Sequence, residues 1–176
     1  FLWQQSLNRL AGQRGRGSLQ GIAAAPVVTH GAVFVVTVNG VLGAYELTTG
    51  QRIWRQNVAT SQAPWVAGNA VFVLTDDGKL LALNAEDGTI RWINRLNTYI
   101  DEKEENKTRY WSGPVLAGER LMVASSDGYA LSINPGTGAK ILATRLLKGT
   151  GVSVPPIVAQ KTLFFLTDDG TVVAFR

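Results

Sequence analysis

One eleven-residue pattern repeats along this sequence, and its clearest copy is Ala44-Tyr45-Glu46-Leu47-Thr48-Thr49-Gly50-Gln51-Arg52-Ile53-Trp54. A second copy is Ala82-Leu83-Asn84-Ala85-Glu86-Asp87-Gly88-Thr89-Ile90-Arg91-Trp92. A weaker third copy is Ser132-Ile133-Asn134-Pro135-Gly136-Thr137-Gly138-Ala139-Lys140-Ile141-Leu142, which has leucine in place of the final tryptophan. Copies of one pattern predict that a single structural unit is used several times.

A proline and a turn glycine at constant spacing mark four such units. The pairs lie 14 residues apart, at Pro26 and Gly40, Pro64 and Gly78, Pro114 and Gly128, and Pro156 and Gly170. Within the first unit the sequence predicts strands over 26–29, 33–38, 41–47 and 51–58, because turn residues separate short runs rich in β-branched side chains. Asn39-Gly40 is the strongest of these turns, since both residue types tolerate positive φ. Four antiparallel strands in roughly 40 residues are typical of a β-propeller blade.

The fold class predicted is therefore all-β, a propeller of four-stranded antiparallel blades with about four blades present. We expect the tryptophans that end the repeats to pack between neighbouring blades. The expected parts of this single partial domain are an outer strand over 1–7, blades over 19–58, 59–97 and 98–147 with an inserted loop over 98–111, and three strands of a last blade over 150–176. Either these blades close as a four-bladed ring or they form half of an eight-bladed ring, which the sequence favours. The first residues, without a methionine or a leader pattern, indicate an internal start within a longer protein.

Composition excludes several classes of protein. The chain has 176 residues, 45% of them hydrophobic, with 5 tryptophans and 19 glycines, which fits a globular β-rich domain with many turns. It has no cysteine, so disulfides within it are excluded. A formal charge of +4, spread along the chain, does not indicate nucleic-acid binding. No apolar run is long enough for a membrane-spanning helix.

Candidate catalytic groups are scarce. His30 is the sole histidine and occupies a turn position, so neither a Ser/His/Asp set nor a Cys/His set is available. Aspartates at the turns, such as Asp76-Asp77 and Asp168-Asp169, are explained by hydrogen bonding to the local backbone rather than by Ca²⁺ binding. The sequence therefore predicts no catalytic residue, no metal and no cofactor.

Two unusual links between units are the candidates for partner contacts. One is the basic, glycine-rich stretch 8–18. The other is the charged insertion between Trp92 and Pro114, which lie 22 positions apart, whereas Trp54 and Pro64 lie 10 apart. In a propeller these links emerge on the same face as the turns between second and third strands, and insertions often map to the binding face. The candidate partner-binding residues are Arg14, Arg16, Tyr99, Asp101, Tyr110 and Trp111. The alternatives are that 8–18 is a solvated loop and that Trp111 packs on its own blade beside Pro114.

The eleven-residue motif at 44–54 and 82–92 resembles that of the quinoprotein-type (PQQ-like) propeller family, and the likeness covers all four units. Within that family, Pro26-Val27-Val28, Ser126-Asp127-Gly128-Tyr129 and Asp169-Gly170-Thr171-Val172 are similar to the C-terminal half of its eight-bladed assembly-factor members, periplasmic lipoproteins of Gram-negative bacteria.

This resemblance implies a non-catalytic scaffold subunit of the β-barrel assembly machinery. Such a subunit would bind the periplasmic domains of BamA and other assembly-machinery subunits, aid insertion of outer-membrane proteins, and be held at the outer membrane by a lipid anchor upstream of this chain. Acidic residues that many members carry in one link are replaced here by Leu19-Gln20-Gly21-Ile22-Ala23-Ala24, so contacts that need those acids do not transfer. The alternatives are a sensor or receptor propeller and a fragment of a quinoprotein dehydrogenase, which would need an adjacent cysteine pair and metal-binding carboxylates.

Overall fold

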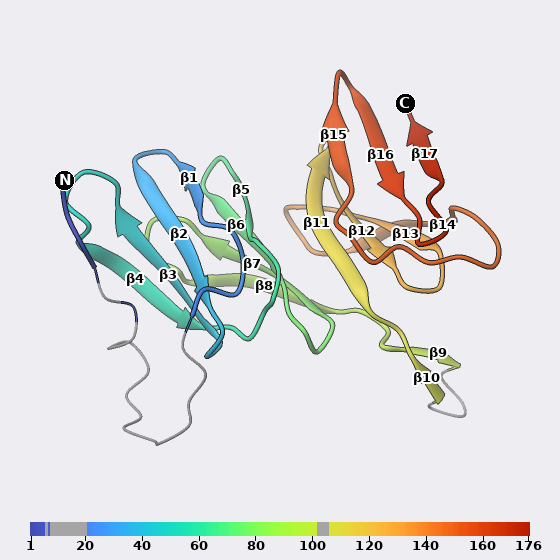
Figure 1. Ribbon diagram of the computed structural model, residues 1–176, viewed down its shortest axis with the longest axis horizontal. Helices are drawn as coiled ribbons and strands as arrows, with labels where there is room; N and C mark the ends of the chain where they lie inside the picture. The colour runs from blue at the N-terminus through green and yellow to red at the C-terminus, as the bar shows by residue number, and fades with distance from the viewer. Residues whose placement is uncertain (6, 8–20, 102–105) are drawn as a thin grey trace.

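The computed structural model describes residues 1–5, 7, 21–101 and 106–176, which contain β-strands and no helix (Figure 1). Two four-stranded sheets come first, β1 (Val27–Thr29), β2 (Ala32–Thr37), β3 (Val41–Glu46) and β4 (Arg52–Asn57), then β5 (Trp65–Ala67), β6 (Ala70–Leu74), β7 (Lys79–Asn84) and β8 (Ile90–Arg95). A two-stranded hairpin follows, β9 (Tyr99–Asp101) and β10 (Asn106–Thr108). The last two sheets are β11 (Trp111–Ala117), β12 (Arg120–Ser125), β13 (Tyr129–Ile133) and β14 (Lys140–Arg145), then the three-stranded β15 (Ile157–Ala159), β16 (Thr162–Leu166) and β17 (Val172–Phe175). The all-β fold expected from the sequence is confirmed.

Each sheet is an antiparallel meander in which consecutive strands pair. The two middle strands are mostly buried, because β-branched and other apolar side chains occupy both of their faces. The outer strand β4 has mainly exposed side chains, with Trp54 as its buried residue. Gly40 closes the turn between β2 and β3 with φ 73, a conformation that glycine adopts without strain.

The four sheets follow one another around a common inner edge made by their first strands. β1 contacts β5, β5 contacts β11, and β11 contacts β15. The chain ends lie on opposite sides of the view in Figure 1, so the described residues form an open row of blades. Residues 1–5 are not part of a strand, although Trp3 is held against the first sheet.

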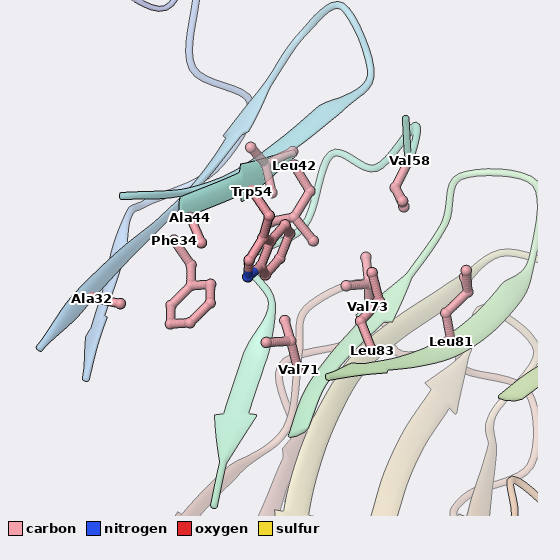
Figure 2. Packing of buried hydrophobic residues seen from close by; sticks show 11 residues of the cluster. Ala32, Phe34, Leu42, Ala44, Trp54, Val58, Val71, Val73, Leu81 and Leu83 are labelled. Atoms are coloured by element: carbon pink, nitrogen blue, oxygen red, sulfur yellow. The ribbon is translucent and has the colours of Figure 1, made fainter. Parts of the chain in front are cut away.

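A tryptophan from one blade docks on the next blade at successive seams. The indole Nε1 of Trp54 donates to the carbonyl oxygen of Ala85 at 2.8 Å, and the ring lies against Gly88. Trp3 and Trp92 repeat this contact on the carbonyls of Leu47 and Pro135. Figure 2 shows Trp54 beside Phe34 and Leu42, facing Val71 and Leu83 of the second sheet. The expectation that these tryptophans pack between blades is confirmed.

Candidate partner-binding face

The links that enter first strands and the turns between second and third strands meet on one face, here called the link face. The carboxylate of Asp76, in the β6–β7 turn, accepts hydrogen bonds from the backbone N and Oγ of Ser61 at 2.9 and 2.7 Å. Asp168, in the β16–β17 turn, accepts one from the backbone N of Ser153 at 3.0 Å. In the second and fourth blades the turn therefore holds the link that enters the same blade, so links and turns share one face, as the sequence predicts.

The insertion between β8 and β11 forms the short hairpin β9–β10, which projects away from the four sheets in Figure 1. Its base is anchored on both sides. The backbone N of Arg109 donates to the carbonyl oxygen of Thr98 at 2.7 Å, and the indole Nε1 of Trp111 donates to the carbonyl oxygen of Asn97 at 2.8 Å. These bonds close the base of the hairpin by joining the two ends of the insertion to each other.

A bidentate ion pair lies under the hairpin. Arg109 Nε and Nη2 donate to the two carboxylate oxygens of Asp127 at 2.7 and 2.6 Å, and the two side chains are only 13% and 14% exposed. The guanidinium also lies 5.7 Å from the ring centre of Trp111 and 5.9 Å from that of Tyr129. Bidentate geometry and partial burial strengthen such a pair relative to one in open solvent. It joins the base of the insertion to the β12–β13 turn.

The ion pair makes the protein sensitive to acid. Burial raises the pKa of Asp127, but hydrogen bonds from Arg109 and Ser125 lower it by more, so the net pKa lies below its ordinary value of 3.8. A carboxyl group with a depressed folded-state pKa stabilises the fold fully above its unfolded-state pKa, and this stabilisation is lost as pH falls through the folded-state pKa.

We expect Asp127→Asn to lower the free energy of unfolding by about 1–3 kcal/mol at pH 7, because the guanidinium of Arg109 loses its counter-charge. The difference from wild type should begin to shrink as pH falls below about 4, where the unfolded chain takes up the proton first, and should vanish below the depressed folded-state pKa, where the carboxyl is protonated in both states. Urea unfolding between pH 7 and pH 2 measures both effects. A variant whose deficit stays constant over this range would contradict the role assigned to the Asp127 charge.

The structure separates the candidate residues named from the sequence. Tyr110 is 66% exposed on the link face, and its backbone N is held by Ser126 Oγ at 3.0 Å. Tyr99 and Asp101 lie exposed on β9. Trp111 is 8% exposed and belongs to the core between the second and third blades, so it packs on the body of the protein. Arg14 and Arg16 lie outside the described residues.

Sequence reasoning missed the pairing of Arg109 with Asp127. Asp127 belongs to a turn motif that explains it locally, and 18 residues separate it from Arg109. The available signal was an arginine two residues before the first strand of the blade whose turn carries Ser126-Asp127-Gly128. Among the described residues no group of three or more His, Cys, Asp or Glu side chains is placed to hold a metal ion. The same residues include no helix long and apolar enough to cross a membrane.

Comparison with known families identifies the family of this chain. A family model described as outer membrane protein assembly factor BamB matches residues 1–94, more than half of the chain. The chain belongs to the BamB family. BamB of Escherichia coli strain K12 is 28% identical over 172 residues, which cover 98% of this chain and 41% of that protein. The chain thus spans about two fifths of the length of this BamB relative.

Solved structures agree on the architecture. BamB from Moraxella catarrhalis superimposes with a TM-score of 0.71 at 20% identity, covering 88% of this chain and 49% of that one. A quinohemoprotein alcohol dehydrogenase from Comamonas testosteroni superimposes with a TM-score of 0.68 at 17% identity, covering 84% of this chain and 29% of the enzyme. At these identities both likenesses concern the propeller fold, while the BamB family match rests on the sequence.

Proposed function

We propose that this chain is part of a non-catalytic scaffold subunit of the β-barrel assembly machinery, which binds periplasmic domains of BamA and aids insertion of outer-membrane proteins. Membership of the BamB family supports the proposal, since those relatives are named outer membrane protein assembly factors. The observation that carries it is the link face, where a blade that needs no insertion nevertheless has an anchored hairpin and an exposed Tyr110. Exposed aromatic residues are frequent anchors of protein interfaces.

In this proposal the subunit works by holding other proteins and is not an enzyme. The dehydrogenases that share its fold do so at 17% identity and over 29% of their length in the Comamonas case, which gives no residue-level support for quinone chemistry. We place the protein in the periplasm, associated with the outer membrane through an anchor outside this chain, as half of an eight-bladed ring. The blade boundaries stated from the sequence belong to the same proposal.

The proposed contact residues are those that the link face exposes. Tyr110 is the central one, and Tyr99 and Asp101 extend the contact along β9. Trp111 supports them from the core, where its indole holds the base of the hairpin. Arg14 and Arg16 remain candidates for a second contact in the basic link.

We expect Tyr110→Ala, introduced into the full-length protein, to reduce recovery of BamA about 5- to 30-fold, as loss of an interface anchor does. The measurement is quantitative mass spectrometry of proteins that co-purify from detergent-solubilised envelopes. Because the side chain is 66% exposed, the substitution should leave the unfolding transition almost unchanged.

The matched control is Ile93→Ala, which removes a 53% exposed apolar side chain from the outer strand β8. It should leave BamA recovery at the wild-type level. If wild type recovers no BamA, the proposed function is wrong. If Tyr110→Ala and Ile93→Ala recover equal amounts, the function stands and the contact lies elsewhere.

A further inference from the structure

A cavity of about 610 Å³ opens on the link face where three blades meet. The second, third and fourth blades contribute the ends of the links that enter their first strands, and the second and third blades also contribute the facing turns. Its lining includes Ser61, Gln62, Asp76, Tyr110, Ser112 and Ser153. Most of these side chains are polar and uncharged, so the cavity suits a polar group presented by another molecule.

The cavity is formed before any ligand arrives. Gln62 Nε2 donates to the carbonyl oxygen of Trp111 at 2.9 Å, and Gln62 Oε1 accepts from the backbone N of Gly113 at 2.8 Å. These bonds fasten the link of the second blade to the first strand of the third. Ser61 is fixed by its two hydrogen bonds to Asp76. Little ordering is required on binding, which favours recognition of a single side chain.

The cavity has one uncompensated charge. Arg109 and Asp76 are the charged residues of its lining, and the charge of Arg109 is compensated by its bidentate pair with Asp127. Asp76 is exposed, and within the described part of the chain no cation lies within ion-pair distance of it. Lys79, close in sequence, pairs with Asp77 instead. The cavity therefore presents a carboxylate and attracts a cation.

The same cavity also has an aromatic ring in its lining, that of Tyr110, which is 66% exposed. The protein already binds one guanidinium in this way, because Arg109 is held by a carboxylate and lies near the rings of Trp111 and Tyr129. A planar guanidinium combines bidentate pairing with stacking on an aromatic face, which an ammonium does less well.

We propose that the cavity receives an arginine side chain of the partner, whose guanidinium pairs with Asp76 and lies against Tyr110. The identity of that partner rests on the proposed function, but the recognition of arginine can be tested without the partner. The probe is the peptide acetyl-Gly-Arg-Gly-amide, compared with the same peptide containing citrulline, which keeps the shape of arginine and lacks its charge.

Titration of the ¹⁵N-labelled chain is expected to shift the amide signals of Ser61, Asp76 and Tyr110 with the arginine peptide. Wild type should bind the citrulline peptide about fivefold more weakly than the arginine peptide. Asp76→Asn should bind the arginine peptide more weakly than wild type by a similar factor, as expected for one exposed ion pair. The asparagine Oδ1 can still accept the hydrogen bonds from Ser61, so the link should stay in place. Equal affinity for the two peptides, or no effect of Asp76→Asn, would overturn the proposal.

The control is Asp87→Asn. Asp87 accepts hydrogen bonds from the backbone N and Oγ of Thr89 at 2.9 and 2.7 Å, as Asp76 does from Ser61, but it lies in the β7–β8 turn on the opposite face. The Asp87→Asn variant should bind the arginine peptide as tightly as wild type does. A parallel assay uses the periplasmic domains of BamA. If wild type binds them and Asp76→Asn does not weaken that binding, the arginine site is wrong and the proposed function stands. If wild type does not bind them but still binds the arginine peptide, the proposed function is wrong and the arginine site stands.

Discussion

Replacing Trp54 by alanine is expected to lower the free energy of unfolding by about 3–5 kcal/mol. The indole is 7% exposed and lies between the first and second sheets, with its ring centre 5.9 Å from that of Phe34 (Figure 2). Its Nε1 hydrogen bond to Ala85 would also be lost, leaving a carbonyl without that donor. The resulting cavity cannot close easily, because both of its walls are paired β-sheets. Urea unfolding followed by far-UV circular dichroism measures the change.

The same position in the third repeat provides a control. Leu142 replaces the tryptophan there and is 53% exposed, so Leu142→Ala should cost less than about 1 kcal/mol. A comparable loss for both variants would show that the repeat position matters through strand propensity rather than through docking on the next blade. A small loss for Trp54→Ala alone would show that the seam relaxes around the missing ring.

The blades were predictable because their signals are local. The strands expected over 33–38 and 41–47 are found as β2 (Ala32–Thr37) and β3 (Val41–Glu46). Turn glycines such as Gly40 need positive φ and so mark hairpins in the sequence itself. The terminal tryptophan of the motif was also informative, since a residue of that size at a repeated position needs a repeated partner, which is the glycine of the next blade.

The insertion was harder to predict. Its charged sequence has no alternation of apolar and polar residues, so an inserted loop was expected where the structure has the hairpin β9–β10. Trp111 follows that stretch directly and gives no local sign of which side it faces. Its burial depends on the hydrogen bond to Asn97, across 14 residues of chain, and on core neighbours from the second blade. Such long-range contacts are not encoded in any short pattern.

The link face likewise combines features that the sequence predicts with features that depend on long-range contacts. The position of the links could be inferred from strand direction alone, and the contacts of Asp76 and Asp168 confirm it. Which side chains remain available to a partner depends on pairings within the face. Arg109 is paired with Asp127, whereas Asp76 has no ion-pair partner among the described residues and Tyr110 is exposed. Those pairings became visible only in three dimensions.

Gly128→Ala is expected to lower the free energy of unfolding by about 3–4 kcal/mol. Gly128 closes the β12–β13 turn with φ 85, where an alanine costs about 1–2 kcal/mol in backbone strain. A Cβ at this position would also lie 2.8 Å from the carbonyl oxygen of Leu147 and closer still to that of Thr150. Both are main-chain atoms of the link that leaves β14, so no side-chain rotation relieves the clash, and overpacking adds about 1–3 kcal/mol. Urea unfolding measures the loss.

Gly170→Ala separates the two contributions. Gly170 has the equivalent position in the β16–β17 turn with φ 86, but a Cβ there would meet no atom within 4 Å. Its substitution should therefore cost only the strain, about 1–2 kcal/mol. The excess cost at Gly128 then measures how tightly the link presses on the turn, which is the contact that fixes the link face. Equal losses of unfolding free energy for the two variants would mean that the link moves aside. The conformation of this part of the link face would then be determined by the incoming partner rather than by the fold.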